Sequence, residues 1–231
     1  MNYEIKRVEE RIIFVPDAEL KRKLKAQLRV FKLMGPVAKS AISVFRKKKG
    51  LKNLLMRHIE GRGRFFITID FVHAFHQITR EMISDVFPKF KRSCFDFCFA
   101  KLGDKNVIPI GFPTSNYFFE LFLSSSVDNA LMDWQHQHRG IATRYSDNIL
   151  VTWRKNNIKE FESLKNIFNH FAVRFTPQVP RKWEEPINFC GITIPRKGKP
   201  HLSNERKRQI RTASKSIKSI HGADIFIREW S

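Results

Sequence analysis

Two aspartates, Asp70 and Asp147, stand at the two most strand-like points of the sequence. Asp70 closes the apolar run FFITID at 65–70, and Asp147 lies in TRYSDNILV at 143–151, which predicts a strand, a two-residue turn at Asp147–Asn148 and a second strand. An aspartate after a strand is also a common turn residue. If the two strands are neighbours, however, both carboxylates meet at one edge of a sheet. Carboxylate oxygens there suit Mg²⁺, which takes substrate phosphates as further ligands, so the pattern indicates two-metal phosphoryl transfer.

The elements that must position these aspartates follow from the apolar spacing along the chain. The run at 65–70 is rich in β-branched residues and predicts a buried strand that ends at Asp70. Asp17 and Thr79 are typical helix caps. Helices are expected at 17–34, 51–59, from 79, at 117–134 and at 158–171, with a further strand at 187–194. This order predicts an α+β fold with an antiparallel sheet.

The charge of the chain favours a polyanionic partner. The 231 residues include 43 Lys and Arg against 22 Asp and Glu, which gives a net charge of +21. Nucleic acid is the usual partner of such a chain, although anionic membrane surfaces also attract it. The basic face of the helix at 17–34 is either a solvated surface or a contact for a phosphate backbone. With 42% hydrophobic residues and 22 Phe, the sequence is that of a folded protein.

Several features bear on the compartment. No run of about 18 apolar residues is present, and the N-terminal MNYEIKRVEE lacks the apolar centre of a secretion signal. Three cysteines are too few for a disulfide framework. Cys94 and Cys98 lie in the apolar CFDFCF, which favours a place in the core over a metal site. We therefore expect a cytoplasmic protein without a membrane contact.

Six short motifs occur in one order along roughly residues 7–210. They are RIIFVPDAELK at 11–21, SVFRKKKGL at 43–51, IDFVHAFHQI at 69–78, PIGFPTS at 109–115, TRYSDNILV at 143–151 and NFCGITI at 188–194. In this order they resemble the motifs of the reverse transcriptases, particularly the bacterial retron-like and defence-associated enzymes. The hairpin TRYSDNILV is similar to the tyrosine-x-Asp-Asp hairpin of that family.

The resemblance implies a right-hand polymerase with palm and fingers, an antiparallel palm sheet and a truncated thumb. Fingers are expected at 1–66 together with part of 79–107, and the palm at 67–200. The stretch 201–231 would be a partial thumb or a basic helical tail, because the sequence after Ile194 is short for a full thumb. An RNA, a protein partner or a neighbouring subunit would then complete the clamp.

The same resemblance implies roles for individual residues. Asp70 and Asp147 would be the catalytic metal ligands, with the backbone carbonyl of Phe71 and the side chain of Asn148 beside them. Arg11 would bind the triphosphate, and the ring of Phe75 would exclude a 2′-hydroxyl. The remaining residues would be Gly111, Pro113, Thr114 and Ser115 under the nucleotide, and Tyr145, Cys190 and Gly191 at the primer and template.

The function implied is that of an RNA-directed DNA polymerase, which uses Mg²⁺ or Mn²⁺, an RNA template and a DNA or RNA primer. A dedicated noncoding RNA and a role in phage defence are further implications of the bacterial relatives. One departure supports an alternative, because Asn148 stands where the family has a second hairpin aspartate. The alternative is a catalytically silent, polymerase-derived subunit that binds RNA or assists assembly. A third possibility, an RNA-dependent RNA polymerase, is disfavoured by Phe75.

Overall fold

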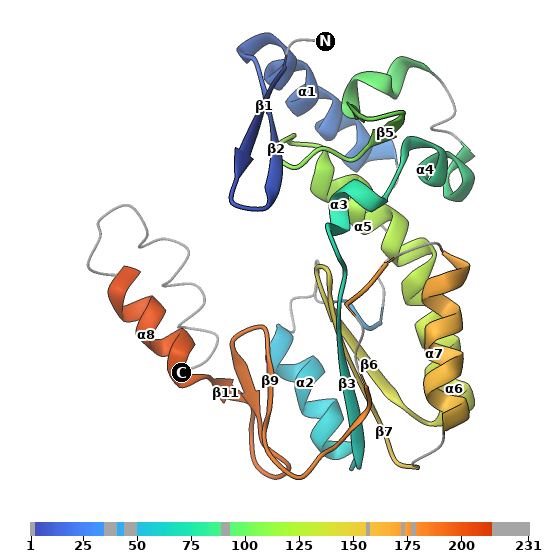
Figure 1. Ribbon diagram of the computed structural model, residues 1–231, viewed down its shortest axis with the longest axis vertical. Helices are drawn as coiled ribbons and strands as arrows, with labels where there is room; N and C mark the ends of the chain where they lie inside the picture. The colour runs from blue at the N-terminus through green and yellow to red at the C-terminus, as the bar shows by residue number, and fades with distance from the viewer. Residues whose placement is uncertain are drawn as a thin grey trace. The chain divides into compact units, whose positions relative to one another are not determined.

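The computed structural model describes residues 3–34, 41–43, 50–88, 93–155, 158–171, 174–176 and 179–213. The chain forms two compact units, each built from separate segments (Figure 1). Unit 1 comprises Met1–Ala41, Phe71–Ala130 and Lys165–Thr176, and unit 2 comprises Ile42–Asp70, Leu131–Leu164 and Pro177–Ser231. None of the described helices has the length and apolar character needed to cross a bilayer.

Unit 2 is organised around a four-stranded antiparallel sheet in the order β6-β7-β3-β8. These strands are β6 (Ile141–Tyr145), β7 (Asn148–Trp153), β3 (Phe65–Asp70) and β8 (Arg181–Lys182). The other elements of this unit are α2 (Leu51–Glu60), β9 (Ile187–Phe189), β10 (Ile192–Ile194), β11 (His201–Leu202) and α8 (Asn204–Ala213), together with parts of α6 (Val127–His138) and α7 (Ile158–His170). Strands β9, β10 and β11 pair as a second small antiparallel sheet.

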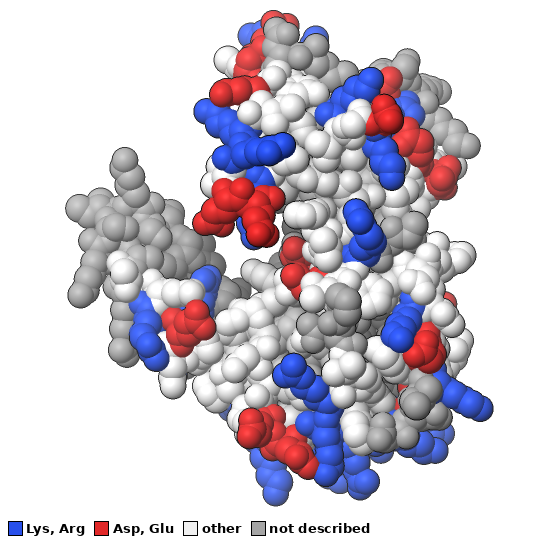
Figure 2. All heavy atoms as spheres, in the orientation of Figure 1, with Lys and Arg blue, Asp and Glu red and all other residues white. Residues whose placement is uncertain are grey.

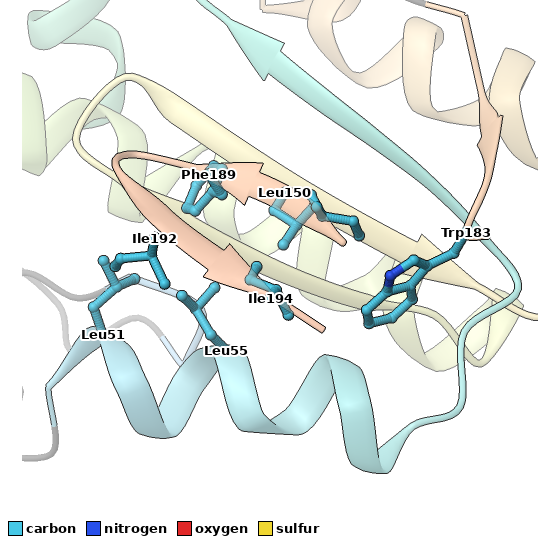
Figure 3. Packing of buried hydrophobic residues seen from close by; sticks show 8 residues of the cluster. Leu51, Leu55, Leu150, Trp183, Phe189, Ile192 and Ile194 are labelled. Carbon is cyan, nitrogen blue, oxygen red and sulfur yellow. The ribbon is translucent and has the colours of Figure 1, made fainter. Parts of the chain in front are cut away.

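One face of the β6-β7-β3-β8 sheet is covered by α2 and the β9–β10 hairpin. Helix α2 buries Leu51, Leu54, Leu55 and His58, a spacing that places all four side chains on one side of a helix. Figure 3 shows Leu51 and Leu55 directed at Ile192 and Ile194 of the hairpin, with Leu150 of β7 and Trp183 in the same cluster. Burying each of these large side chains contributes about 1.5–3 kcal/mol, which fixes the hairpin against the sheet.

His58 ties α2 to the two strands that carry the Asp147 hairpin. Its Nδ1 lies 2.8 Å from Thr152 Oγ1 on β7, and its Nε2 lies 2.9 Å from Thr143 Oγ1 on β6. Burial, and secondarily the charge of Arg57, lower the pKa of His58 to about 3. The imidazole is therefore neutral and can bridge the two hydroxyls as one donor and one acceptor.

On the opposite face of the sheet, tryptophan side chains of β7 and α6 pack against each other. Trp153 of β7 meets Trp134 of α6 edge to face, with ring centroids 6.3 Å apart. The indole N–H of Trp134 donates to Ser163 Oγ of α7 at 2.8 Å. Both rings are almost fully buried, so this face is part of the core of unit 2.

Unit 1 packs around aromatic side chains. Its elements are β1 (Tyr3–Val8), β2 (Arg11–Pro16), α1 (Ala18–Met34), α3 (Ala74–Gln77), α4 (Arg80–Val86), a 3-10 helix (Ser93–Cys98), β4 (Ala100–Leu102), β5 (Lys105–Val107) and α5 (Ser115–Ser125). Phe31 of α1 is fully buried, and its ring lies 5.3 Å from that of Phe95, 5.4 Å from that of Tyr117 and 5.2 Å from that of Phe118. Much of the high phenylalanine content therefore serves this core.

Most of the expected elements are present, and both helix caps are confirmed. Asp17 Oδ1 accepts from the backbone N–H of Leu20 at 2.7 Å, and Thr79 Oγ1 accepts from that of Met82 at 3.3 Å. Cys98 is buried as expected, while the side chain of Cys94 lies outside the described residues. The motif residues at 44–49 and residues 214–231 of the expected thumb also lie outside them.

Three expectations about local structure were wrong. The helix at 117–134 is two helices, because the backbone breaks at Ser126 between α5 and α6. The strand at 187–194 is a hairpin that turns at Cys190 and Gly191, both with positive φ. The turn near Asp147 consists of Ser146 and Asp147, and Asn148 is already the first residue of β7, paired with Tyr145. Ser146 takes the left-handed conformation (φ 56°) that the turn requires.

Candidate active site

The candidate catalytic residues of unit 2 lie in one row across the end of its sheet. Asp70 is the last residue of β3 and pairs with Asn148 of β7, which in turn pairs with Tyr145 of β6. Directly opposite residues on antiparallel strands have Cα atoms about 4.5–5.5 Å apart and direct their side chains to the same face. Asp70 is exposed and Tyr145 is 39% exposed, so this row is open to solvent.

Asp147 joins this row from the β6–β7 turn. The Asn148 carboxamide donates a hydrogen bond from Nδ2 to Asp147 Oδ1 at 3.1 Å. The guanidinium of Arg144, itself fully buried, donates from Nη1 to the carbonyl of Ser146 at 2.9 Å. The hydrogen bond from Arg144 therefore fixes the backbone of the turn, and the hydrogen bond from Asn148 orients the carboxylate of Asp147 at its tip.

The turn of the β9–β10 hairpin brings Cys190 into the field of both aspartates. Burial, and then the negative charges of Asp147 and Asp70, raise the pKa of the Cys190 thiol to about 12. The thiol is therefore protonated at neutral pH and acts as a small apolar group. The shift also shows that both carboxylates act on one point, which indicates a concentrated negative potential at this end of the sheet.

Gly191 allows α8 to approach the same turn. The residue has φ 77°, and a Cβ there would meet the side chain of Arg206 at 3.2–3.3 Å. Its carbonyl accepts from the backbone N–H of Ser203 at 3.0 Å, just before α8 begins. Cys190 and Gly191, which the sequence predicted to lie at the primer and template, thus form a tight turn between the carboxylate row and the basic helix α8.

The other predicted site residues belong to unit 1, where Gly111 is required by a close approach of two backbones. Gly111 has φ 108°, and a Cβ there would lie 2.4 Å from the carbonyl oxygen of Phe14. The N–H of Phe14 donates to the carbonyl of Ile110 at 2.8 Å. The motif PIGFPTS at 109–115 is therefore joined to β2, the strand that begins with Arg11.

The next residues of this motif differ in their exposure. Gly111 is exposed and Pro113 is partly exposed, but the side chains of Thr114 and Ser115 are buried at the start of α5. Ser115 Oγ donates to the carbonyl of Pro109, which closes the loop on itself. The hydroxyls of Thr114 and Ser115 thus face the protein interior, and a contact with a nucleotide remains a prediction for this loop.

Phe71 and Phe75 are held by aromatic neighbours within unit 1. The ring of Phe75 stacks on Phe119 of α5, with centroids 4.5 Å apart and planes at 19°. Phe71 is buried and packs edge to face on Phe168 at 5.8 Å. The half-buried ring of Phe75 is consequently held in one orientation, as a steric gate would need.

A hollow of about 370 Å³ in unit 1 contains residues that we did not identify from the sequence. Its lining includes His73, His76, Gln77 and Arg174 beside Glu10 of the β1–β2 turn. Burial, and then the charge of His73, lower the pKa of His76. The Gln77 amide holds the backbone of Arg174 by donating to its carbonyl at 2.8 Å. The spacing of His73 and His76 within IDFVHAFHQI was the signal that could have pointed here.

The structure thus brings the predicted residues together in two groups. Unit 2 contains Asp70, Asp147, Asn148, Tyr145, Cys190 and Gly191, and unit 1 contains Arg11, Phe71, Phe75, Gly111, Pro113, Thr114 and Ser115. Within the described parts of the chain, no three His, Cys, Asp or Glu side chains gather into a metal site of their own. A cation at the sheet end would therefore depend on two carboxylates, backbone and amide oxygens, and ligands supplied by a substrate.

An antiparallel sheet that carries aspartates on one strand end and on the adjacent hairpin is characteristic of polymerases of the right-hand class. Residues 9–194 match the family described as "Reverse transcriptase (RNA-dependent DNA polymerase)". This chain belongs to the reverse transcriptase family. The matched range includes every residue assigned to the candidate site. No curated protein matches the chain.

Several solved structures share the fold. The telomerase of Candida albicans, in complex with a TWJ fragment of telomeric RNA, aligns with a TM-score of 0.59 at 9% identity, over 92% of this chain and 50% of that one. A foamy viral protease-reverse transcriptase in complex with double-stranded DNA aligns with a TM-score of 0.54 at 18% identity, over 99% and 36%. Apo telomerase from Candida tropicalis gives 0.54 at 12% identity, over 84% and 47%.

At these identities the likeness shows the fold alone. It is a reverse transcriptase-like fold of mixed helix and sheet, as the sequence predicted. The chain spans half or less of the length of each of these proteins.

Proposed function

We propose that this chain is an RNA-directed DNA polymerase that joins dNTPs to a primer 3′ end by two-metal nucleotidyl transfer. In that reaction the primer 3′-oxygen attacks the α-phosphate of a dNTP and pyrophosphate leaves. The observation that carries the proposal is the placement of Asp70 and Asp147 at one end of the sheet, in a chain of the reverse transcriptase family. Catalysis of this kind depends mainly on position and charge neutralisation, which such a sheet end can supply.

The donor atoms at the sheet end fit a hard divalent cation. Asp70 and Asp147 offer carboxylates, Asn148 offers an amide oxygen, and Phe71, next to Asp70 in the chain, would offer its backbone carbonyl. Burial raises the pKa of Cys190 most, and the charges of Asp147 and Asp70 raise it further; that second contribution is negative charge that a cation would offset. Bound Mg²⁺, or Mn²⁺ in its place, would stabilise the charge that develops on the attacking and leaving oxygens.

Residues of unit 1 would bind and select the nucleotide. Arg11 is exposed at the start of β2, where its guanidinium can bind phosphate oxygens in a fork. The ring of Phe75, braced by Phe119, would leave no room for a 2′-hydroxyl. The Gly111–Ser115 loop would form the floor of the site, with Gly111 and Pro113 in contact and the buried Thr114 and Ser115 setting its shape.

Residues of unit 2 would hold the primer. Tyr145 lies in the same row as Asp70 and exposes its ring, so it can support the primer terminus beside the carboxylates. The turn at Cys190 and Gly191 lies close enough to those carboxylates to be affected by their charge, which supports its role as a primer grip.

The finer assignment forms part of the same proposal. We extend it to a cytoplasmic enzyme of the bacterial retron-like and defence-associated kind. Its fingers would be at 1–66 with part of 79–107, its palm at 67–200, and a partial thumb or basic helical tail at 201–231. A dedicated noncoding RNA, a protein partner and a role in phage defence accompany that assignment. The order of the motifs supports the family as a whole, and sequencing of RNA that co-purifies with the protein tests the noncoding RNA directly.

Primer extension tests the activity. Poly(rA) primed with oligo(dT) is incubated with labelled dTTP and either Mg²⁺ or Mn²⁺, and elongation is expected for the wild type. The variant Asp147→Ala should be inactive, while Glu185→Ala, an exposed acid elsewhere in unit 2, serves as the matched control and should keep activity. Elongation by Asp147→Ala equal to that of the wild type would contradict the proposed role of this carboxylate.

One observation favours a second function, that of a catalytically silent RNA-binding or assembly subunit. Asn148 places an amide donor against Asp147 where a second carboxylate would stand. That arrangement lowers the negative charge available to a cation by one unit. Tight binding of a primer–template without elongation at any concentration of Mg²⁺ or Mn²⁺ would support this function in place of the first.

A further inference from the structure

The end of the unit 2 sheet opposite the aspartates gathers four segments that are far apart in the sequence. The N–H of Arg64 donates to the carbonyl of Trp153 at 2.8 Å, and the N–H of Trp183 donates to the carbonyl of Arg64 at 2.7 Å. Arg154 Nε donates to the carbonyl of Gly61 at 3.0 Å. The loop after β10 reaches the same place, because residues 196–198 line a hollow together with residues 59, 62, 63 and 183.

These four segments are strongly basic. Residues 60–64, 154–155, 181–185 and 196–199 read EGRGR, RK, RKWEE and RKGK, so basic side chains outnumber acidic ones by nine to three. All of these charged side chains are exposed, and one of the acids, Glu184, is paired with Lys182 at 2.5 Å. Figure 2 shows Lys and Arg side chains gathered over the end of unit 2 where β3 begins and β7 ends. We call this set of four segments the basic end.

The basic end is concave. The hollow in it has a volume of about 890 Å³, and its lining includes Arg62, Arg196 and Lys197, with Ile59 and Trp183 as apolar neighbours. That size lies in the range that proteins use for small-molecule or nucleotide sites. A concave basic surface with an apolar floor suits a strand that carries phosphates on one side and bases on the other. A lipid bilayer, by contrast, presents a broad plane to a flat or convex amphipathic surface.

We propose that the basic end binds the phosphate backbone of a nucleic-acid strand, at a site separate from the candidate active site. The six residues of β3 separate Arg64 from Asp70, which corresponds to about 20 Å along the strand. At about 3.4 Å per phosphate, a bound strand would place about six phosphates between the two ends. Contacts of Lys and Arg with phosphate carry no base information, so binding is independent of sequence. The site requires no polymerase activity.

Binding of an unprimed RNA tests this site. Poly(rU) is titrated with the protein in buffer containing EDTA, so that no metal at the aspartates contributes. The double variant Arg196→Ala/Lys197→Ala removes two phosphate contacts, which lowers the salt slope of single-strand binding by about 1.4 and the affinity by about 25-fold at 0.1 M salt. The variant Lys101→Ala/Lys105→Ala removes the same charge from exposed positions on β4 and β5 and should lose far less affinity.

A charge-conserving variant separates loss of charge from loss of folding. Arg196→Lys/Lys197→Arg should bind poly(rU) as the wild type does. Equal losses in the Arg196/Lys197 and Lys101/Lys105 variants would overturn the proposal, because they would reflect net charge alone. It is also overturned if anionic vesicles of phosphatidylserine displace poly(rU) and bind in a manner that depends on Arg196 and Lys197. Binding of poly(rU) in EDTA needs no polymerase activity, so an inactive wild type that still binds through Arg196 and Lys197 would refute the proposed polymerase and leave this site standing.

Discussion

At the scale of single residues, Asn148 determines how much negative charge faces a cation at the sheet end. It stands opposite Asp70 and donates its amide to Asp147. In Asn148→Asp, three carboxylates would converge, which costs stability without a cation and tightens cation binding when one is present. We expect this variant to reach half-maximal primer extension at roughly tenfold lower Mg²⁺, equivalent to about 1.4 kcal/mol. A Mg²⁺ titration of wild type and variant measures the difference.

The outcomes of this titration separate the two proposed functions. An equal Mg²⁺ dependence in both proteins would show that position 148 does not set metal affinity. If the wild type were inactive at every metal concentration and Asn148→Asp restored synthesis, the natural chain would be the silent subunit. Asn129→Asp adds a carboxylate on the exposed surface of α6 and controls for added charge alone.

Cys190 offers a readout of metal binding that does not require activity. The charges of Asp147 and Asp70 contribute to its raised pKa, after burial. A divalent cation at these carboxylates should therefore lower the pKa of the thiol from about 12 and speed its alkylation at alkaline pH. Mass spectrometry of Cys190 after iodoacetamide treatment, with and without Mg²⁺, measures this change. The acceleration should vanish in Asp147→Asn, and a Mg²⁺ effect of the same size in that variant would contradict the assignment.

Phe75 carries the prediction about sugar selection. Its ring is stacked on Phe119 and cannot turn aside for a 2′-hydroxyl. In Phe75→Val this wall is removed, and the preference for dNTPs over rNTPs should fall by about tenfold or more. Single-nucleotide incorporation with dTTP and UTP measures the ratio. Phe65→Val removes a ring at the other end of β3 and should leave the ratio unchanged, so a change in both variants would point to a general effect on folding.

At the scale of elements, the sequence predicted the type of most helices and strands, but it did not predict which residues form the turns between them. The caps at Asp17 and Thr79 were predictable because a single side chain makes each one. The turn at Ser146–Asp147 was not, because it requires a serine with positive φ, a conformation that nothing in the sequence indicates. The turn at Cys190 and Gly191 is a similar case. Glycine alone would be compatible with a turn, but this turn also needs a positive φ at Cys190, which its residue type does not indicate.

In the candidate site, too, features that depend on local sequence patterns were predictable, whereas features that depend on contacts between distant segments were not. The pairing of Asp70 with Asn148 follows from two strands whose apolar patterns were visible. The burial of Thr114 and Ser115, the approach of Arg206 to Gly191 and the hollow at His73 and His76 arise from segments distant in the sequence. Single-sequence patterns contain no direct information about such contacts, which explains why these features were not predicted.

The link between α2 and the Asp147 hairpin gives a prediction for pH. His58 has a pKa of about 3 in the folded protein, below its ordinary value of 6.5, so the unfolded chain binds a proton that the folded chain excludes. Stability from this residue is complete above about pH 6.5 and is lost as the pH falls toward 3, by about 1.4 kcal/mol per pH unit. Urea unfolding of His58→Gln and of the exposed His136→Gln, compared with wild type from pH 4 to 7, should show a shallower pH slope only in the first. Parallel slopes in all three proteins would exclude His58 as the source.

At the scale of the whole molecule, two compact units are each assembled from three stretches of chain, and unit 2 carries charge of opposite sign at the two ends of one sheet. The acidic end would require cations and phosphates to neutralise it, and the basic end would attract the phosphates of a strand. The proposed polymerase would use both properties, the basic end to hold a polyanion and the carboxylates to meet its reactive end through cations. The basic end has nine basic and three acidic side chains, so it contributes +6 of the net charge of +21.

This charge predicts a steep salt dependence for the binding of a primer–template. If six to ten phosphates are neutralised by Lys and Arg, the affinity should fall by about 10³–10⁵ between 50 and 200 mM salt. Fluorescence anisotropy of a labelled RNA–DNA hybrid over that range measures the slope of log affinity against log salt. The slope should be the same for two unrelated sequences, because the contacts are with the backbone. A nearly salt-independent affinity would mean that stacking or base contacts dominate, and would refute the view that the excess of basic residues serves to bind nucleic acid.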